Sequence, residues 1–347
     1  MDHEKVLLTG VTGFFGTHVA HELLKQKFVV VGTYRNAAKL SQYEESHPEE
    51  IQSRQLMFVE VDITSEDAYD EVFKLHPDIK YIIHTATPAD VTNPNPEIAL
   101  FDKTVHAAVS LVSAAHKYAK DVKRVVFTSS AVAAQDIMRP SGIVLNEQSY
   151  NTYTREHAKV NAFLAYFAGK KAAEQALFEY VKQEHPGFDI VSFIAPAIVG
   201  PYLNKAESIT KVPMPPQMIA NLTDRVDDVG LMPWALNTYV DIRDLAQLHV
   251  LAIQNISGIP GNRRYLSVAG YHYPQKLVDT AKKVLPKAYA DRIYPLKLNS
   301  YDEQTAIEGY TYDCEETAKI LKFKYRPFEE TVRDAVIYAI DLKDRSS

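Results

Sequence analysis

Residues 6–16 read Val6-Leu-Leu-Thr-Gly10-Val-Thr-Gly13-Phe-Phe-Gly16, and this stretch decides the fold. It joins a strand pattern at Lys5–Thr9 to a helical pattern at Thr17–Lys27. Glycines at such a turn let the backbone come close to a pyrophosphate, because they carry no Cβ atom. The helix that follows supplies unpaired N–H groups and a partial positive charge. The stretch therefore predicts a dinucleotide-binding turn, with an ordinary loop as the alternative.

Short apolar runs alternate with helical patterns as far as residue 195. The predicted strands cover 28–34, 56–62, 81–85, 124–129 and 189–195, and the predicted helices cover 37–50, 66–75, 94–120 and 165–184. Strands that are regularly separated by helices predict a parallel sheet with helices on both faces. We therefore predict an α/β fold of the Rossmann type, with a doubly wound parallel sheet.

The composition changes after Pro196. Six prolines fall between 196 and 233, so this segment cannot be regular helix and sheet throughout. A strand at 239–242 and a helix at 243–253 are predicted next, and the tail holds several helical patterns. We predict that 1–195 with 236–255 form the nucleotide-binding domain. We predict that 196–235 with 256–347 form a smaller, mostly helical substrate-binding domain.

The composition is that of an ordinary globular protein. The chain has 347 residues, of which 46% are hydrophobic and 24% charged, and its net charge is −6. An acidic chain of this kind is a poor candidate for nucleic acid. The single cysteine, Cys314, cannot form an internal disulfide, and the longest stretch without charged residues, Val6–His21, is too short for a bilayer. With no signal-peptide pattern, we expect a cytoplasmic monomer or homodimer without a membrane partner.

The end of the second predicted strand selects the cofactor. An NAD site usually places an acid there, about 20 residues beyond the glycines, to hold the ribose hydroxyls. Here that position is Arg35, with Lys39 one helical turn further on and the nearest following acid at Glu44. Arginine and lysine together could hold a 2′-phosphate. We therefore predict NADPH/NADP+ as the cofactor, with two solvated surface cations as the alternative.

Tyr166-Phe-Ala-Gly-Lys170 places a tyrosine and a lysine on one face of the predicted helix. Tyrosine has an ordinary pKa of about 10 and is a poor acid or base at neutral pH. A neighbouring ammonium group stabilises the phenolate and lowers that pKa. A hydroxyl from the strand end Thr128-Ser129-Ser130 would polarise a substrate carbonyl. The set predicts carbonyl reduction by hydride transfer, which needs no metal, and no Cys/His cluster has metal-ligand spacing.

The motif Thr9-Gly10-x-x-Gly13-Phe14-x-Gly16 resembles the extended short-chain dehydrogenase/reductase family. Within this family, the chain is most similar to fungal NADPH-dependent methylglyoxal and aldehyde reductases, with plant dihydroflavonol reductases as cousins. Val126-Phe-Thr-Ser-Ser-Ala131 fits the family's pattern around the catalytic serine. The corner Tyr239-Val-Asp-Ile-Arg-Asp-Leu-Ala246 also matches, and we expect it to be structural.

The resemblance implies a catalytic set. Ser130 is the expected catalytic hydroxyl, with Ser129 as the alternative. Tyr166 is expected to donate the proton, and Lys170 to tune Tyr166 and to hold the nicotinamide ribose.

The resemblance also implies the cofactor contacts. Asp62-Ile63 matches the family's adenine-contacting pair, with a helix or turn cap as the alternative for Asp62. Ala195-Pro-Ala-Ile-Val-Gly-Pro201 resembles the segment whose backbone contacts the nicotinamide amide. The expected cofactor-binding residues are Gly10, Thr12, Gly13, Phe14, Phe15, Gly16, Arg35, Lys39, Asp62, Ile63, Thr85, Ala86, Thr87, Thr128, Tyr166, Lys170, Pro196, Ile198 and Val199.

Several positions depart from the family pattern. His106 stands where relatives often have an asparagine that hydrates the catalytic lysine, and a packing histidine is the alternative. Gly169 replaces the usual serine, and we expect it to leave room for the cofactor. The predicted substrate-side positions are Ala89, Ala131, Ile198 and Trp234. The first three are often aromatic in the yeast reductases, so we predict a wide pocket that accepts bulky aryl ketones.

The function that we predict is an NADPH-dependent carbonyl reductase acting on a small-molecule aldehyde or ketone. One alternative is an NAD-dependent sugar-nucleotide epimerase or dehydratase, which Arg35 disfavours because such enzymes keep tightly bound NAD. Another is a non-catalytic NADP(H)-binding sensor, which is disfavoured because such proteins commonly lose Tyr166 or Lys170.

Overall fold

The structure is a computed structural model. It describes residues 3–88, 90–136, 142–204, 206, 208–209, 212, 214–223, 237–294 and 310–345. The chain forms two compact units. The first comprises the described residues of Met1–Asp136, Glu147–Ile194 and Ala246–Tyr265, and the second those of Ile137–Asn146, Ala195–Leu245 and Leu266–Ser347.

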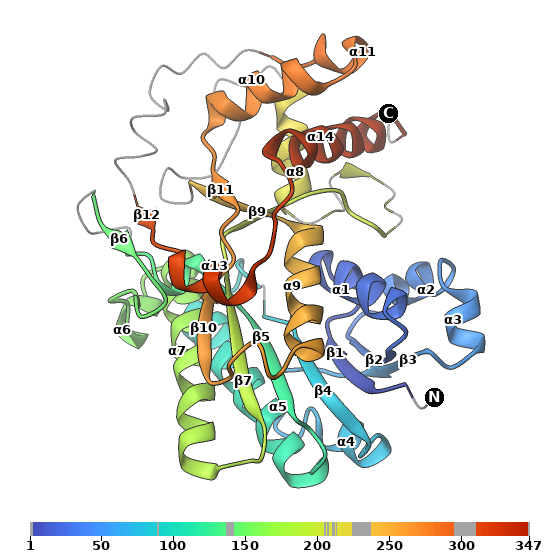
Figure 1. The fold of residues 1–347 in the computed structure, drawn as a ribbon, viewed down its shortest axis with the longest axis vertical. Coiled ribbons are helices and arrows are strands. Elements are labelled where there is room, and N and C mark those ends of the chain that lie inside the picture. Colours follow the sequence, from blue (N-terminus) through green and yellow to red (C-terminus); the bar gives the residue numbers. More distant parts are fainter. Residues whose placement is uncertain are drawn as a thin grey trace. The chain divides into compact units, whose positions relative to one another are not determined.

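A seven-stranded sheet forms the centre of the first unit (Figure 1), in the order β10-β7-β5-β4-β1-β2-β3. Its strands are β1 (Lys5–Thr9), β2 (Val29–Tyr34), β3 (Leu56–Glu60), β4 (Ile79–His84), β5 (Arg124–Ser130), β7 (Asp189–Ala195) and β10 (Arg263–Leu266). The strand β1 pairs in parallel with both β2 and β4, so the strand order reverses beside it. Ligands of doubly wound sheets bind at such a switch point, at the carboxyl ends of the strands. The predicted fold class is confirmed.

Helices cover both faces of this sheet. They are α1 (Phe14–Lys25), α2 (Ala37–Glu44), α3 (Pro48–Gln52), α4 (Asp70–Leu75), the π-helix η1 (Glu97–Asp102), α5 (Lys103–Tyr118), α6 (Arg155–Ala158), α7 (Ala162–Glu184) and α9 (Ile242–Gln254). Residues of α4, α5 and α7 share one core with the sheet, including Leu111 and Leu177. On the other face, the His249 ring of α9 lies 4.8 Å from both Phe15 of α1 and Phe193 of β7.

Two predicted helices are divided in the structure. The pattern at 37–50 forms α2 and α3, because Pro48 lacks the N–H that a continuous helix needs and instead begins α3. The pattern at 94–120 forms η1 and α5. By length and composition alone, one helical stretch among the described residues, Glu97–Tyr118, could cross a membrane, but half of it is buried. Its packing against α7 and α4 is that of a core helix.

The division into units differs from the predicted domains at three segments. The first, described over 142–146, belongs to the second unit, where its strand β6 (Val144–Leu145) pairs with β12 (Thr311–Tyr312). The strand β10 was not predicted, and it places residues up to Tyr265 in the first unit because it joins the sheet beside β7. Residues 237–245 belong to the second unit, because β9 (Thr238–Asp241) pairs with β8 (Ala197–Val199) and β11 (Gly270–Tyr271).

The described part of the second unit contains the helices α8 (Met214–Ala220), α10 (Pro274–Val284), α11 (Lys287–Ala290), α13 (Glu315–Leu321) and α14 (Phe328–Arg345). Its short strands β6 (Val144–Leu145) and β12 (Thr311–Tyr312) form a pair of their own. Residues of α8, α10 and α14 form one apolar core.

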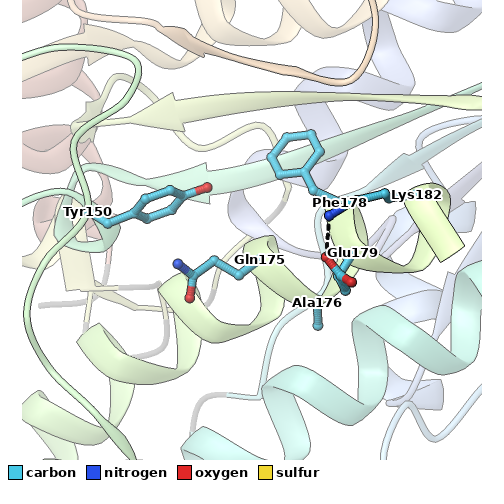
Figure 2. Close-up of a pocket in the computed structure, with 6 residues that line it drawn as sticks. All are labelled: Tyr150, Gln175, Ala176, Phe178, Glu179 and Lys182. Atoms are coloured by element: carbon cyan, nitrogen blue, oxygen red, sulfur yellow. Dashed lines mark ion pairs between the residues drawn. The ribbon is translucent and has the colours of Figure 1, made fainter.

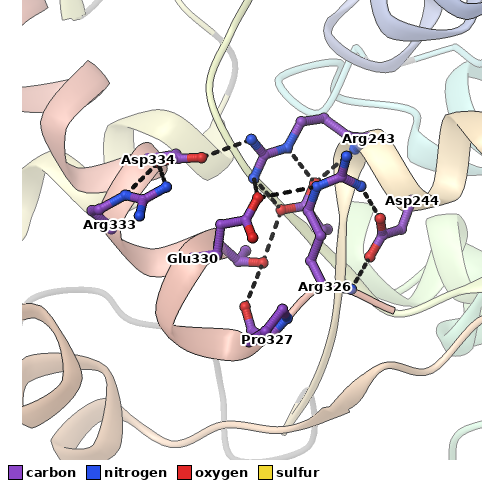
Figure 3. A network of polar contacts seen from close by, with 9 residues as sticks. Arg243, Asp244, Arg326, Pro327, Glu330, Arg333 and Asp334 are labelled. Atoms are coloured by element: carbon purple, nitrogen blue, oxygen red, sulfur yellow. Dashed lines mark hydrogen bonds and ion pairs between the residues drawn. The ribbon is translucent and has the colours of Figure 1, made fainter. Parts of the chain in front are cut away.

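A polar network ties the start of α9 to α14 within the second unit (Figure 3). The guanidinium of Arg243 contacts Asp241 at 2.8 Å and Asp334 at 2.7 Å. Burial acts to raise the pKa of Asp241, but the contacts with Arg243 outweigh it and hold that pKa below its usual range. Asp244 pairs with Arg326 beside this cluster. The predicted strand–helix corner therefore lies in an ion-pair network.

Candidate active site

The glycine turn leaves the N-terminus of α1 without a side-chain cap. A Cβ atom on Gly16 would lie 2.0 Å from the Gly10 carbonyl oxygen, so only glycine fits there. The helix begins at Phe14 with no side-chain cap at Gly13 and no acidic residue in its first turn. The first N–H groups of a helix have no partners inside it and carry partial positive charge. The turn therefore has the backbone geometry and the charge that suit a phosphate.

A pocket of about 290 Å³ lies in front of this turn, at the carboxyl ends of β1 to β4. Most of the predicted cofactor residues line it, namely Gly10, Thr12, Gly13, Phe14, Phe15, Gly16, Arg35, Lys39, Ile63, Thr85, Ala86 and Thr87. Four further lining residues, Thr33, Tyr34, Asn36 and Val61, were not predicted. Their position at or just after the ends of β2 and β3 is the sequence signal that could have found them.

Two cations stand in this pocket without carboxylate partners. Arg35 follows β2 and Lys39 lies in the first turn of α2, where the Asn36 side chain accepts a hydrogen bond from the Lys39 backbone N–H at 3.0 Å. Both side chains are exposed, and neither forms an ion pair with a carboxylate of the described residues, although the charge of Arg35 helps to lower the pKa of Asp62. Unpaired cations beside a helix N-terminus fit a doubly charged 2′-phosphate. The residues present therefore fit the phosphate groups of NADPH.

Asp62 lies in the turn after β3, between the lining residues Val61 and Ile63. Its carboxylate is exposed and accepts hydrogen bonds from the Thr64 backbone N–H at 3.0 Å and the Thr64 hydroxyl at 2.8 Å. These bonds hold the pKa of Asp62 below its usual range. Asp62 does not line the pocket, whereas Ile63 does. The Asp62 side chain thus caps the turn, as the alternative interpretation expects, and its contact with the adenine stays a prediction.

Thr9 ties the ends of β1 and β4 together. Its hydroxyl oxygen accepts hydrogen bonds from the backbone N–H groups of Thr85 and Ala86, both at 3.1 Å, and lies 2.8 Å from His84 Nδ1. The Thr85 hydroxyl in turn donates to the Thr9 carbonyl at 2.6 Å. Burial and the charge of Lys170 lower the pKa of His84 to about 3, so the ring is neutral. The pocket wall at Thr85 and Ala86 is therefore fixed by Thr9, which was not predicted as a site residue.

Ser130 and Tyr166 come together in the first unit. Ser130 ends β5, and its hydroxyl accepts a hydrogen bond from the Val132 backbone N–H at 3.4 Å. Tyr166 lies in the second turn of α7, and its phenol interacts with the Ser130 side chain. Ser129, the alternative for the catalytic hydroxyl, is buried and its Oγ has no hydrogen-bond partner. The geometry thus favours Ser130 over Ser129.

The ionisation of Tyr166 reflects its buried position. Burial raises the pKa of Tyr166, and the Ser130 side chain opposes this only in part. The Lys170 ammonium donates instead to the Thr128 carbonyl at 2.8 Å and lies 4.8 Å from the centre of the Phe127 ring. Burial and the Ser130 side chain are what act on the pKa of Tyr166 here, so the lowering by Lys170 stays a prediction.

Lys170 is buried at the centre of this arrangement. Burial lowers the pKa of Lys170 to about 8, and the carboxylate of Glu174, one turn along α7, acts in the opposite direction. The Thr128 hydroxyl lies 2.9 Å from His249 Nε2, and the Thr128 carbonyl accepts the hydrogen bond from Lys170. Both groups therefore have partners within the first unit.

Gly169 and His106 have packing contacts. A Cβ atom on Gly169 would lie 3.1 Å from the Leu100 carbonyl oxygen and the Phe101 Cα atom. The predicted role of Gly169 is to leave room for the cofactor. The structure shows instead that Gly169 allows α7 to pack closely on η1. His106 is half-buried, and its Nε2 lies 2.8 Å from the Ser65 carbonyl oxygen.

The remaining predicted residues do not line the pocket. Pro196, Ile198 and Val199 belong to the second unit, where Pro196 is buried and the other two are half-buried. Ala131 is buried in the first unit. Ala89 and Trp234 lie outside the described residues. The roles of all these residues stay predictions.

A second hollow lies on the outer surface of α7 (Figure 2). It has a volume of about 530 Å³ and is lined by Tyr150, Gln175, Ala176, Phe178, Glu179 and Lys182. None of the predicted site residues is among them, so the hollow at the glycine turn remains the candidate cofactor site.

The sequence profile of the NAD dependent epimerase/dehydratase family matches residues 6–266. The chain belongs to this family, which confirms the predicted resemblance. It is 31% identical over 339 residues to a ketoreductase of Aspergillus niger, azaE, with 96% of each chain covered. Over 346 residues it is 27% identical to the NADPH-dependent methylglyoxal reductase GRE2 of Saccharomyces cerevisiae, which covers 98% of this chain and 99% of that one. Since such relatives are oxidoreductases, the predicted enzyme class is confirmed.

The fold is also that of a solved reductase. The crystal structure of yeast methylglyoxal/isovaleraldehyde reductase Gre2 with NADPH superposes with a TM-score of 0.86. The two chains are 24% identical, and the match covers 98% of this chain and 99% of that one. This likeness is one of fold, and it agrees with the predicted fold class.

Proposed function

We propose that this protein is an NADPH-dependent carbonyl reductase that converts an aldehyde or ketone to an alcohol. The observation that carries the proposal is the interaction of Ser130 with Tyr166, in the same unit as a pocket that Arg35 and Lys39 line. The names of the relatives, a ketoreductase and an NADPH-dependent reductase, support the same reaction.

NADPH is the cofactor, and it supplies the hydride that reaches the carbonyl carbon. The α1 N-terminus binds the pyrophosphate, and Arg35 with Lys39 binds the 2′-phosphate. The absence of an acid at the end of β2 argues against the epimerase alternative, because an NAD site uses one for the ribose hydroxyls.

Tyr166 holds the proton that the carbonyl oxygen receives. Because burial raises its pKa, the phenol is protonated throughout the physiological range and ready to donate. The Ser130 hydroxyl donates a second hydrogen bond to the same oxygen and stabilises the charge that develops there. Lys170 binds the ribose of the cofactor. Its positive charge stabilises the phenolate that remains when Tyr166 has lost its proton.

The substrate is a bulky ketone in this proposal. Ala131 follows the catalytic serine and is small, and the name of the Aspergillus niger relative supports a ketone substrate. Aryl ketones should therefore be reduced faster than methylglyoxal. A preference for methylglyoxal would remove this part of the proposal and leave the reductase itself in place.

The test is oxidation of NADPH, followed by absorbance, with carbonyl compounds from methylglyoxal to diaryl ketones. We expect turnover with NADPH well above that with NADH. Tyr166→Phe should lower kcat by about 100-fold or more, since it removes the proton donor, while Tyr150→Phe, outside the site, should not. No turnover of any carbonyl by a protein that binds NADPH would favour a sensor, and tightly bound NAD in the purified protein would favour an epimerase.

A further inference from the structure

The segment Glu147–Tyr153, which we call the strap, runs through the first unit without helix or strand. At its first half, the buried Arg264 donates a hydrogen bond to the Glu147 carbonyl at 2.9 Å and lies 3.8 Å from the centre of the Tyr150 ring. At its second half, the Lys171 ammonium donates to the carbonyls of Asn151, at 3.1 Å, and Tyr153. The strap is therefore fixed at both ends.

The Asn151 side chain joins the two segments that carry the catalytic hydroxyls. Its Nδ2 donates to the Val132 carbonyl at 2.7 Å and to the Phe167 carbonyl at 3.1 Å. Val132 is the residue whose backbone N–H bonds the Ser130 hydroxyl, and Phe167 directly follows Tyr166. The Asn151 backbone N–H also donates to the Ala133 carbonyl at 2.9 Å.

Only an amide satisfies this position. Two carbonyl oxygens face Nδ2 and can only accept, whereas the Tyr153 backbone N–H faces Oδ1 at 3.0 Å and can only donate. The side chain is buried, with 3% of its surface exposed. Water is therefore not at hand to replace a lost hydrogen bond, and the loss costs free energy. An aspartate would place an oxygen against two carbonyl oxygens, and an alanine would remove all three hydrogen bonds to the backbone.

We propose that Asn151 is a positioning residue that sets the spacing between the Ser130 and Tyr166 hydroxyls. The proposal rests on the function proposed above. Asn151 touches neither of these hydroxyls, and it acts through the peptide groups beside them. The pocket at the glycine turn is built from other elements, so Asn151 should affect the reaction and not the binding of NADPH.

The test compares Asn151→Ala and Asn151→Asp with Thr152→Val. The Thr152 hydroxyl bonds Asp136 from the same strap, but it does not reach the residues beside Ser130 and Tyr166. We expect both Asn151 variants to lower kcat by about tenfold or more, because small displacements of reacting groups are costly. The Kd of NADPH, measured by fluorescence titration, should stay within about twofold of the wild-type value. Thr152→Val should have the wild-type kcat. All rates are measured below each variant's unfolding midpoint.

A double-mutant cycle separates positioning from general destabilisation. If Asn151 acts through Ser130, Ser130→Ala with Asn151→Ala should be no slower than Ser130→Ala alone. Additive losses, or a folded Asn151 variant with unchanged kcat, would overturn the proposal. Should the alanine and aspartate variants not fold, Asn151→Ser gives the same comparison. A wild-type protein that reduces no carbonyl would instead overturn the proposed function.

Discussion

The charge of Lys170 controls how the site responds to pH. Burial places its pKa at about 8, well below the ordinary value of 10.5. We expect kcat/KM for ketone reduction to fall above about pH 8, as Lys170 loses the proton that holds the ribose. Between pH 8 and 10.5 the folded state binds fewer protons than the unfolded state, so the free energy of unfolding should rise with pH there from this group. A rate that stays flat to pH 10 would contradict this assignment.

Glu174 provides the control for that assignment. Its carboxylate is buried, pairs with Arg264 at 3.1 Å and acts to raise the pKa of Lys170. Glu174→Gln should move the alkaline limb of the rate profile to lower pH. Glu179→Gln, an exposed residue of the same helix, should leave the profile unchanged. Because breaking a buried ion pair costs about 3–5 kcal/mol, rates are measured well below the variant's unfolding midpoint.

We expect Arg35 and Lys39 to decide between the two nicotinamide cofactors. Replacing both with serine should raise the KM for NADPH by about tenfold or more, because charge-assisted bonds to the 2′-phosphate are lost. The KM for NADH should change little. Lys25→Ser, at the far end of α1, is the matched control. An equal change in both KM values would mean that the two cations serve the fold or the shared part of the cofactor.

Single residues could be predicted where their chemistry follows from type and spacing. The glycine turn, Arg35 and Lys39 are of this kind, and all of them line the pocket. The Tyr166 pKa could not be predicted, because it depends on burial that the sequence does not specify. Asp62 was ambiguous for a similar reason, since its partner Thr64 satisfies it locally.

Helix α7 packs closely against η1 at Gly169, next to Lys170. Gly169→Val would place its side chain against the Leu100 carbonyl and the Phe101 backbone, which cannot move as a side chain can. We expect a loss of about 1–3 kcal/mol in the free energy of unfolding, measured by denaturant titration. Gln175→Val, an exposed site on the same helix, controls for the helix propensity of valine. Equal losses in the two variants would show that the contact is not tight.

Element boundaries were predictable where an apolar run ends at clear turn residues. The strands β1 and β7 have their predicted bounds. The strand β10 was missed, because Arg263 and Arg264 interrupt any apolar pattern. Arg264 is nevertheless buried, since Glu174 on α7 pairs with it. The hydrophobic pattern alone does not predict a buried strand that contains a cation, when the partner of that cation lies far away in the sequence.

Across the whole molecule, cofactor binding should appear as a gain in thermal stability. A ligand that binds only the folded state stabilises it by about 2.7 kcal/mol when present at a hundred times its Kd. NADPH should therefore raise the unfolding midpoint more than NADH at equal concentration. The variant with serine at positions 35 and 39 should lose most of that difference. Equal shifts from both cofactors in the wild-type protein would contradict the cofactor assignment.

The fold class could be predicted for the whole chain, but the membership of each segment in a unit could not. Residues 142–146 and 237–245 belong to the second unit and residues 256–265 to the first, each the reverse of the prediction. Their assignment depends on which sheet each short strand joins, β9 with β8 or β10 with β7. Such pairings are long-range contacts that local patterns do not encode.

The central claim, hydride transfer to a carbonyl carbon with Tyr166 as proton donor, has one direct test. NADPH labelled with deuterium at either C4 position of the nicotinamide is supplied with a ketone that the protein reduces, and the alcohol is examined by mass spectrometry and NMR. We expect one deuterium at the carbinol carbon from one of the two labelled forms, and none above background with Tyr166→Phe. An alcohol without deuterium from either form, or full incorporation by Tyr166→Phe at the wild-type rate, would contradict it.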